Sequence, residues 1–353
     1  MKFRANPLLL LGAALLLPGC AAVESRGIQP RRSAENADPP EFRALTFTPE
    51  LEEKILALDP EHVSEKDVRE VLSRAPAPRI VNIHGGIFPV YLMMVSFSEF
   101  LVAMGYPASS VGNPDGTYSY SCYEDSAMIA GVVAWYYEKE GMRPMIIGHS
   151  QGGMQTIKVL RQLAGDYSMH VAVWNPVTGR SERRYQIVDP FTGQQRPVVG
   201  LQVCYATAEG AGGITRLLPN QWDMEFSLRQ VPDTVEDFTG FYQKFDLLGG
   251  DFLGFGPANL FHAAGKAVVR NVELPASYGH AAIPDTRRLA DSQEVRDWIN
   301  NYTPALHPKS DPKLNGDTRH ILWAADVWYS IKKHWVLELQ RVIRAKRALA
   351  HAS

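Results

Sequence analysis

The residue with the clearest chemical potential is a serine in the segment 148–153, which reads GHSQGG. Ser150 has a glycine two positions away on each side, which is the G-x-S-x-G spacing of a serine held at a sharp turn between a strand and a helix. Glycines suit these positions because a Cβ atom would collide with the neighbouring strand and helix. The free N–H groups of a helix that begins at Gln151 would stabilise negative charge beside the hydroxyl. The pattern predicts a nucleophilic serine.

A serine nucleophile needs a base to accept its proton, and histidine is the usual one. Among the ten histidines of the chain, His280 has the most suitable place. It follows an expected strand at 268–274 and precedes a helix, so it would lie at the carboxyl end of the last strand. His149 is expected to point elsewhere on the turn, and His262 to lie within a helix near 257–264. The sequence therefore predicts His280 as the base.

The base in turn needs an orienting carboxylate, which should follow the preceding strand. Asp246 would be the first residue beyond a strand at 238–245. Choosing Asp251 would bury the charge of Asp246 within the strand, which is costly when the charge is unpaired. The interval from Asp251 to the histidine, however, better suits one helix plus one strand. The sequence favours Asp246 and leaves Asp251 open, with Asp223 or Asp237 as further alternatives.

An oxyanion hole is the remaining requirement for acyl chemistry. The segment 84–87 reads HGGI and closes an expected strand at 79–83, where glycines let backbone N–H groups approach a substrate oxygen closely. We expect one donor from Gly86 or Ile87 and the other from Gln151, the residue after the nucleophile. Removing one such donor typically costs about 3 kcal/mol of transition-state stabilisation.

These residues need a scaffold, and the middle of the chain indicates a parallel sheet. Short β-branched runs alternate with longer helical patterns, which implies βαβ units with helices on both faces of the sheet. The expected strands are 79–83, 145–147 and 171–174, and the expected helices are 90–104, 123–139 and 151–163. The alternation breaks at about 180–237, which fits an insertion. It resumes at 238 with a strand, followed by a helix near 257–264, a strand at 268–274 and a helix near 292–299.

The N-terminal region precedes this alternation. A helix is expected around 51–58, and a second opens at Ser64, where the sequence SEKD is typical of a capping box. We assign 1–19 to a signal peptide and 20–77 to a tether with N-terminal helices. The main domain would span 78–305, with the insertion at about 180–237, and 306–353 would form a C-terminal helical extension.

The first residues have the pattern of an export signal. Lys2 and Arg4 precede an uncharged segment of ten residues, 8–17, which is too short to span a bilayer of roughly 30 Å. The ending LPGC resembles a bacterial lipoprotein signal, in which cleavage exposes Cys20 for lipid attachment, for example with palmitate. The alternative is an ordinary secretory signal. We expect an exported, membrane-anchored lipoprotein of the bacterial envelope, periplasmic or on the cell surface.

The other two cysteines and the C-terminal helix leave alternatives open. Cys122 and Cys204 could pair in an oxidising compartment. The tail 318–350 predicts a long amphipathic helix in which tryptophans alternate with basic residues. Such a helix could lie on an anionic membrane, but packing of its apolar stripe on the domain is the favoured interpretation.

Composition excludes several classes of protein. The 353 residues are 45% hydrophobic, which excludes wholesale disorder, and the net charge of −2 argues against a dedicated nucleic-acid binder. Three cysteines are too few for a disulfide scaffold. No HExxH, GxxxxGK or CxxC motif occurs, so zincin, P-loop and zinc or redox interpretations have no support.

The HGG turn, the GHSQGG segment, the acid and the histidine occur in the order of the α/β-hydrolase family, which the region from Pro78 to Ile299 resembles. The resemblance implies a mostly parallel sheet flanked by helices, with a lid inserted after the sixth strand. The insertion at about 180–237 would be this lid. The chain leaves little room for the family's first two strands before Arg79, so we expect a shortened sheet.

The resemblance also implies the activity, that of a serine esterase or lipase that needs no cofactor or metal. Ser150, His280 and Asp246 or Asp251 would cleave a small-molecule or lipid ester through an acyl-enzyme. An acyltransferase or amidase would use the same residues, and a non-catalytic binding lipoprotein is the alternative from another class.

Overall fold

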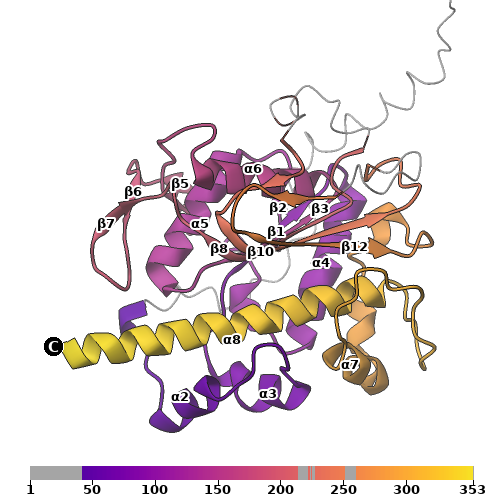
Figure 1. Cartoon of the computed structure of the whole chain (residues 1–353), viewed down its shortest axis with the longest axis horizontal. Coiled ribbons are helices and arrows are strands. Elements are labelled where there is room, and N and C mark those ends of the chain that lie inside the picture. The colour runs from indigo at the N-terminus through magenta and orange to yellow at the C-terminus, as the bar shows by residue number, and fades with distance from the viewer. Residues whose placement is uncertain (1–41, 214–221, 223, 225–226, 251–259, 353) are drawn as a thin grey trace, which may run out of the picture.

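A parallel sheet forms the centre of the molecule. The computed structural model describes residues 42–213, 222, 224, 227–250 and 260–352. The described residues form a six-stranded sheet in the order β12-β10-β8-β3-β1-β2, in which every neighbouring pair is parallel (Figure 1). Its strands are β1 (Ile80–His84), β2 (Tyr120–Ser121), β3 (Met145–His149), β8 (Val203–Glu209), β10 (Val235–Gln243) and β12 (Val268–Leu274).

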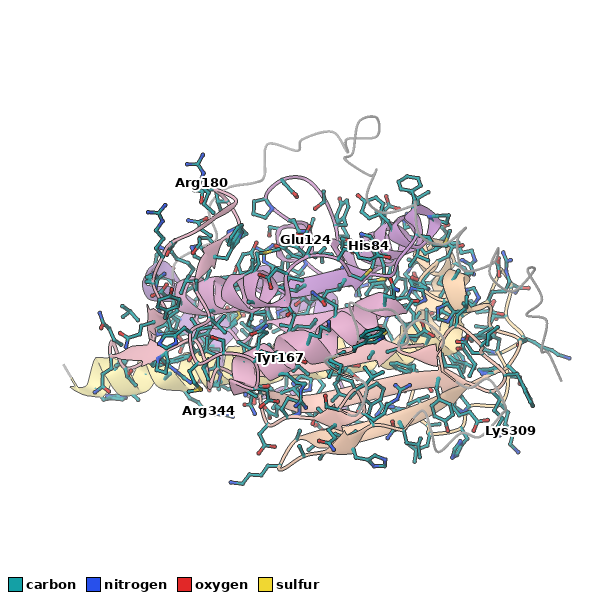
Figure 2. All side chains as sticks on the ribbon, turned by 90° about the horizontal axis from the view of Figure 1, so that it is seen from above. His84, Glu124, Tyr167, Arg180, Lys309 and Arg344 are labelled. Atoms are coloured by element: carbon teal, nitrogen blue, oxygen red, sulfur yellow. The ribbon has the colours of Figure 1, made fainter. Side chains whose placement is uncertain are left out.

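Helices cover both faces of the sheet, so the predicted α/β architecture is confirmed (Figure 1). The first of the six strands begins at Ile80, and the described residues before it, 42–79, contribute no strand to the sheet. This agrees with the expectation of a sheet without two further strands before Arg79. One face packs against α4 (Phe88–Ala103) and α8 (Ile321–Ala352), and the other against α5 (Ser126–Glu140) and α6 (Gln151–Ala164). Figure 2 shows the same layers turned by 90°, with Arg344 on α8 towards one end of the molecule and Lys309 towards the other.

The N-terminal helices lie against α8. They are α2 (Pro49–Leu56) and α3 (Glu65–Glu70), flanked by the 3-10 turns η1 (Phe42–Ala44) and η2 (Leu72–Arg74). The predicted capping box is confirmed, because the Ser64 hydroxyl accepts the Asp67 N–H at 3.2 Å and the Asp67 carboxylate accepts the Ser64 N–H at 2.9 Å. The signal segment 1–19 and Cys20 lie outside the described residues.

One strand was assigned wrongly. The run 171–174 does not join the central sheet, because β4 (Trp174–Asn175) pairs only with β5 (Arg180–Ser181) in a hairpin. The apolar side chains of Val171 and Val173 are buried against the helical layer instead. β3 pairs with β1 on one side and with β8 on the other, and β8 lies inside the segment predicted as the lid.

The predicted lid at 180–237 therefore divides around a central strand. Before β8 the chain forms a second hairpin, β6 (Gln186–Val188) with β7 (Gln195–Pro197). The described residues between β8 and β10 lie outside the central sheet, and 214–221, 223 and 225–226 are not described. The expected helix near 257–264 is also wrong where it can be seen, because His262 lies in the short strand β11 (His262–Ala263), paired with β9 (Gln230–Val231).

The later elements follow the expectation more closely. The helix expected near 292–299 is α7 (Gln293–Asn300). Further 3-10 turns among the described residues are η3 (Ala108–Ser110), η7 (His280–Ala282) and η8 (Arg287–Ala290).

The long helix α8 is part of the core. Trp323, Trp328 and Trp335 are completely buried, so the packing interpretation of this helix is confirmed. The Lys332 ammonium donates to the Asn300 carbonyl at 3.0 Å, and the Gln340 amide donates to the Ile55 carbonyl at 3.1 Å. Within the described residues, no helix combines the length and apolar character needed to cross a bilayer.

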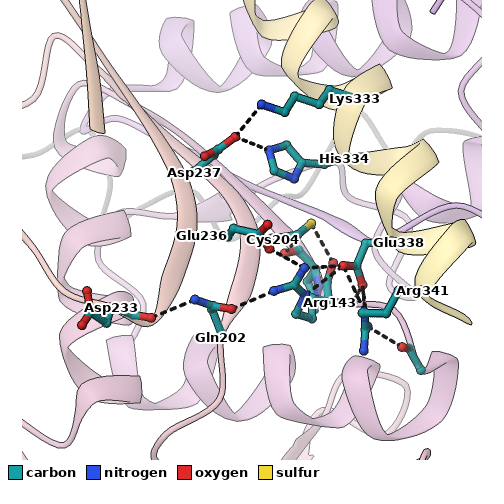
Figure 3. Close-up of polar contacts among 12 residues, drawn as sticks. Arg143, Gln202, Cys204, Asp233, Glu236, Asp237, Lys333, His334, Glu338 and Arg341 are labelled. Carbon is teal, nitrogen blue, oxygen red and sulfur yellow. Dashed lines mark hydrogen bonds and ion pairs between the residues drawn. The ribbon is translucent and has the colours of Figure 1, made fainter. Parts of the chain in front are cut away.

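A polar network ties α8 to the amino ends of the strands (Figure 3). The buried carboxylate of Glu338 accepts the Arg143 N–H at 2.7 Å and the Arg143 Nε–H at 2.8 Å. The Cys204 thiol lies in the same region and donates to the Arg143 carbonyl at 3.1 Å, whereas the Cys122 thiol donates to Gln151 Oε1 at 3.3 Å. Both cysteines are thiols, so the disulfide left open by the sequence is not formed.

Candidate active site

Ser150 occupies the turn between β3 and α6, as predicted. Its φ of 57° and ψ of −125° place a non-glycine residue in a sparsely populated region, at a cost of about 1–3 kcal/mol. The Ser150 N–H donates to the Glu209 carbonyl at 2.7 Å, and the Ser150 carbonyl accepts the Gly153 N–H at 2.9 Å. These bonds to β8 and α6 hold the strained backbone.

The two glycines of the motif lie where the sequence argument requires them. A Cβ atom on Gly148 would be 2.3 Å from Thr156 Oγ1, and one on Gly152 would be 2.0 Å from the Ile83 carbonyl oxygen. Gly148 thus lets α6 approach, and Gly152 lets α6 cross β1. The prediction that both glycines avoid collisions with helix and strand is confirmed.

His280 and Asp246 complete a continuous chain of contacts from the serine. His280 Nε2 lies 2.8 Å from Ser150 Oγ, and His280 Nδ1 lies 2.7 Å from Asp246 Oδ2. Because an ionised carboxylate can only accept, Nδ1 carries the proton and Nε2 accepts from the serine hydroxyl. All three side chains are largely buried, with 10% of the histidine side chain exposed.

Asp246 is the carboxylate that the structure brings to His280. It lies three residues beyond the last residue of β10, so the strand ends two residues earlier than predicted, and the intervening Phe245 has a φ of 63°. Asp246 Oδ1 accepts the N–H groups of Leu248 at 3.0 Å and Gly249 at 2.8 Å. Burial raises the pKa of Asp246, but the bond from and the charge of His280, with these two N–H donors, outweigh it and leave the pKa below its usual value.

The other predicted acids do not share this place. Asp237 lies at the opposite end of β10, where its carboxylate is 3.0 Å from His334 Nε2 and 3.1 Å from Lys333 Nζ (Figure 3). Asp223 and Asp251 lie outside the described residues.

The HGGI segment lies directly against the serine. A Cβ atom on Gly85 would be 2.7 Å from Ser150 Cβ, and one on Gly86 would be 2.3 Å from Gln151 Oε1. Ile87 is the N-cap of α4, and Gln151 is the first residue of α6. Gly85 therefore lies against Ser150 and Gly86 against the side chain of Gln151. The role of Gly86, Ile87 and Gln151 as oxyanion donors stays a prediction.

Apolar side chains are exposed next to these residues. Phe88 follows the HGGI segment and is 39% exposed, and Phe245, immediately before Asp246, is 71% exposed. The Tyr123 hydroxyl lies 3.4 Å from the position a Gly86 Cβ would take, and this tyrosine is also exposed. The surroundings of Ser150 thus offer apolar contact area.

A second histidine–carboxyl pair lies beneath the first and was not foreseen from the sequence. His149 Nε2 donates to the His280 carbonyl at 2.7 Å and lies 2.8 Å from Glu209 Oε2. Burial lowers the pKa of His149 to about 4 and raises that of Glu209 to about 8. The sequence signal for Glu209 is its place at the end of an apolar run before Gly210, but this run falls inside the segment predicted as the lid.

Comparison with known proteins adds no relative. No family model, curated protein or solved structure matches the chain. Within the described residues, no group of three or more histidine, cysteine, aspartate or glutamate side chains is arranged to hold a metal ion.

Proposed function

We propose that this chain is a serine hydrolase of the α/β-hydrolase type that cleaves carboxylic esters. The observation that carries the proposal is the unbroken sequence of contacts from Ser150 Oγ through His280 to Asp246, at 2.8 and 2.7 Å. A hydroxyl, an imidazole and a carboxylate in this order are the parts of nucleophilic acyl chemistry. The strained backbone at the serine adds support, because strain of this kind clusters at functional sites.

The first half of the reaction forms an acyl-enzyme. Ser150 Oγ attacks the acyl carbon of the ester while His280 Nε2 takes the hydroxyl proton, and Asp246 stabilises the resulting imidazolium. The N–H of Gln151 and that of Gly86 or Ile87 donate to the oxyanion. When the intermediate collapses, the carbon–oxygen bond to the alcohol breaks and the alcohol leaves with the proton from Nε2.

The second half releases the acid. His280 takes a proton from water, whose oxygen attacks the acyl carbon of the Ser150 ester. Collapse of this second intermediate returns the proton to Ser150 Oγ and frees the carboxylic acid. Transfer to another alcohol, or attack on an amide, would use the same groups, so these reactions are outcomes of the test below.

The substrate we propose is a small-molecule or lipid ester with an apolar part. The exposed aromatic rings of Phe88 and Phe245 next to the site support this choice. We also propose export and lipid anchoring at Cys20, on the basis of the LPGC signal. Replacing Cys20 by Ala would then release the chain from the membrane fraction and abolish incorporation of labelled palmitate, whereas unchanged fractionation would contradict anchoring.

A fluorophosphonate probe tests the catalytic proposal. It should label the parent protein and not Ser150→Ala, while Ser168→Ala, at an exposed serine, should label as the parent does. p-Nitrophenyl esters of rising chain length would then define the acyl preference. Absence of labelling in the parent would overturn the proposal and favour a non-catalytic binding lipoprotein. Labelling without ester hydrolysis would favour the transferase or amidase.

A further inference from the structure

The pair Glu209 and His149 occupies the carboxyl ends of two neighbouring central strands. Glu209 is the last residue of β8 and His149 the last residue of β3, and the two are partners in the register of the sheet. Both side chains are completely buried. The pair therefore lies in the layer of the sheet immediately beneath the site.

Glu209, Gly210 and His149 together lie against all three residues Ser150, His280 and Asp246. The Glu209 carbonyl accepts the Ser150 N–H at 2.7 Å, and His149 Nε2 donates to the His280 carbonyl at 2.7 Å. Gly210, with a φ of 55°, follows directly. A Cβ atom there would be 2.8 Å from His280 Cε1 and 3.6 Å from Asp246 Oδ2, so the backbone after Glu209 is packed against the imidazole–carboxylate pair.

The geometry at Glu209 is unusual for a buried carboxyl. A carbonyl can only accept, so His149 Nε2 carries a proton aimed at the His280 carbonyl, and Glu209 Oε2 lies 2.8 Å from the same nitrogen. Neither carboxyl oxygen of Glu209 has a hydrogen-bond partner among the described residues. Burying an ionised carboxylate in this way is expensive, and such a group takes up a proton instead.

The charged and titratable groups that act on the pair come from four strands. Three groups act on Glu209: His149 at the end of β3, Asp246 in the loop after β10, and His280 in the turn after β12. His149 is also close enough to His84, at the end of β1, for the two imidazoles to repel each other when protonated. An imidazolium on His280 favours a negative Glu209, and the carboxylate of Asp246 disfavours it.

We propose that His149 and Glu209 are positioning residues of this site, and that the carboxyl of Glu209, when it loses its proton, supplies a second negative charge to the imidazole of His280. His149 holds the backbone of His280 through its Nε2–H, and Glu209 holds the backbone of Ser150 through its own carbonyl. The carboxyl of Glu209 lies against His149 Nε2. The catalytic meaning of this arrangement rests on the proposed hydrolase function.

The sign of the effect follows from the charges. Burial raises the pKa of Glu209 to about 8, so the carboxyl is neutral at pH 7 and negative in mildly alkaline solution. A negative charge beneath His280 stabilises its imidazolium, which is the form that the proposed transition state creates. The rate of acylation should therefore rise in mildly alkaline solution as Glu209 ionises.

Titration of the His280 ring by NMR tests the proposal on the full chain, without any substrate. Histidine side chains are isotope-labelled, and the His280 resonances are assigned by their loss in His280→Gln. In the parent, these resonances should show an additional inflection near pH 8, which Glu209→Gln removes and Asp237→Asn, at the opposite end of β10, retains. If the parent shows no such inflection, or Glu209→Gln keeps it, the role of Glu209 is wrong; the parent curve alone decides this if the variant fails to fold.

A second pair of variants tests the positioning by His149. Glutamine places its side-chain N–H close to where Nε2 of histidine lies, so His149→Gln can still donate to the His280 carbonyl, whereas His149→Ala cannot. We expect His149→Ala to slow fluorophosphonate labelling of Ser150 by about tenfold to a hundredfold and His149→Gln to restore most of the rate. Equal labelling in the alanine variant and the parent would overturn this role. If the parent is not labelled, the hydrolase function fails, while the titration still decides the role of Glu209.

Discussion

Ser150 Oγ lies 2.8 Å from His280 Nε2, although 130 residues separate the two in the chain. The parallel sheet explains the distance, because the carboxyl ends of all its strands meet at one edge. Ser150 follows β3 directly, and His280 lies six residues after β12. Two strands, β8 and β10, stand between them, so the connecting loops must return over the edge of the sheet to bring the side chains together.

Replacing Asp246 by Asn should remove most of the activity on a p-nitrophenyl ester. The variant keeps the shape of the side chain, but its amide no longer favours the productive tautomer of His280, and kcat should fall by roughly 10⁴. The control is Asp237→Asn, which removes a carboxylate at the other end of β10. Similar losses in the two variants would contradict the assignment of Asp246.

Adding a methyl group at Gly152 should destabilise the protein. The new Cβ atom would lie 2.0 Å from the Ile83 carbonyl oxygen, which is backbone and cannot move aside cheaply. We expect Gly152→Ala to lower the free energy of unfolding by about 2–3 kcal/mol, measured by urea denaturation. Gly279→Ala is the matched control, because no atom lies within 4 Å of its added Cβ and its φ is −78°. Equal stabilities of the two variants would show that α6 does not cross β1 as closely as described.

The buried imidazole of His149 should make the parent less stable in acid. Burial lowers its pKa to about 4, whereas the unfolded chain binds the proton near pH 6.5, so the unfolded state gains protons first as the pH falls. Relative to His149→Gln, the parent should lose up to about 3 kcal/mol of unfolding free energy between pH 7 and pH 4. Urea denaturation at a series of pH values measures the difference. Parallel curves for parent and variant would contradict the burial of a neutral imidazole.

Glu209 should have the opposite effect. Its pKa is about 8 in the folded protein and 4.5 in the reference state, so the folded state holds a proton that the unfolded state has already lost. Relative to Glu209→Gln, the parent should therefore lose unfolding free energy as the pH rises from 4.5 to 8. The same denaturation series checks this sign, and a parent that gains stability over that interval would show that Glu209 is ionised and paired.

Breaking the contact between Arg143 and Glu338 should be strongly destabilising, because the glutamate is fully buried and its partner would lose a charge that compensates its own (Figure 3). Glu338→Gln leaves the guanidinium of Arg143 partly unpaired, and we expect a loss of about 3–5 kcal/mol in the free energy of unfolding. Glu236 pairs with the same arginine at 2.5 Å, but its side chain is 42% exposed. Glu236→Gln should therefore cost less than about 1 kcal/mol. A reversal of this order would contradict the role given to α8.

Local motifs were sufficient to predict the parts of the site that depend on one turn. The glycines around Ser150 and the position of His280 after a strand both reflect steric and topological rules that act over a few residues. The acid was harder, because a turn with positive φ at Phe245 places Asp246 three residues beyond the strand, and such a turn has no clear sequence pattern.

Long-range pairing was not predictable in the same way. The apolar run 171–174 has the composition of a central strand, yet its valines pack against helices, while β8 contains Thr207 and ends in Glu209. Polar residues within a buried strand are tolerated only by their three-dimensional neighbours, which a single sequence does not reveal. The contact between His149 and Glu209 depends on this register, so it became visible only with the sheet assembled.

The separation of β3 from β12 has a consequence for biogenesis. A folding intermediate that contained only β1, β3 and α6 would already bend the chain at Ser150, but its hydroxyl would be an ordinary alcohol without an imidazole nearby. The serine would acquire reactivity only once β8, β10 and β12 have joined the sheet and brought His280 to it. Labelling of Ser150 by the fluorophosphonate probe during refolding would then report when His280 reaches the serine. This labelling should appear later than the helical circular dichroism signal.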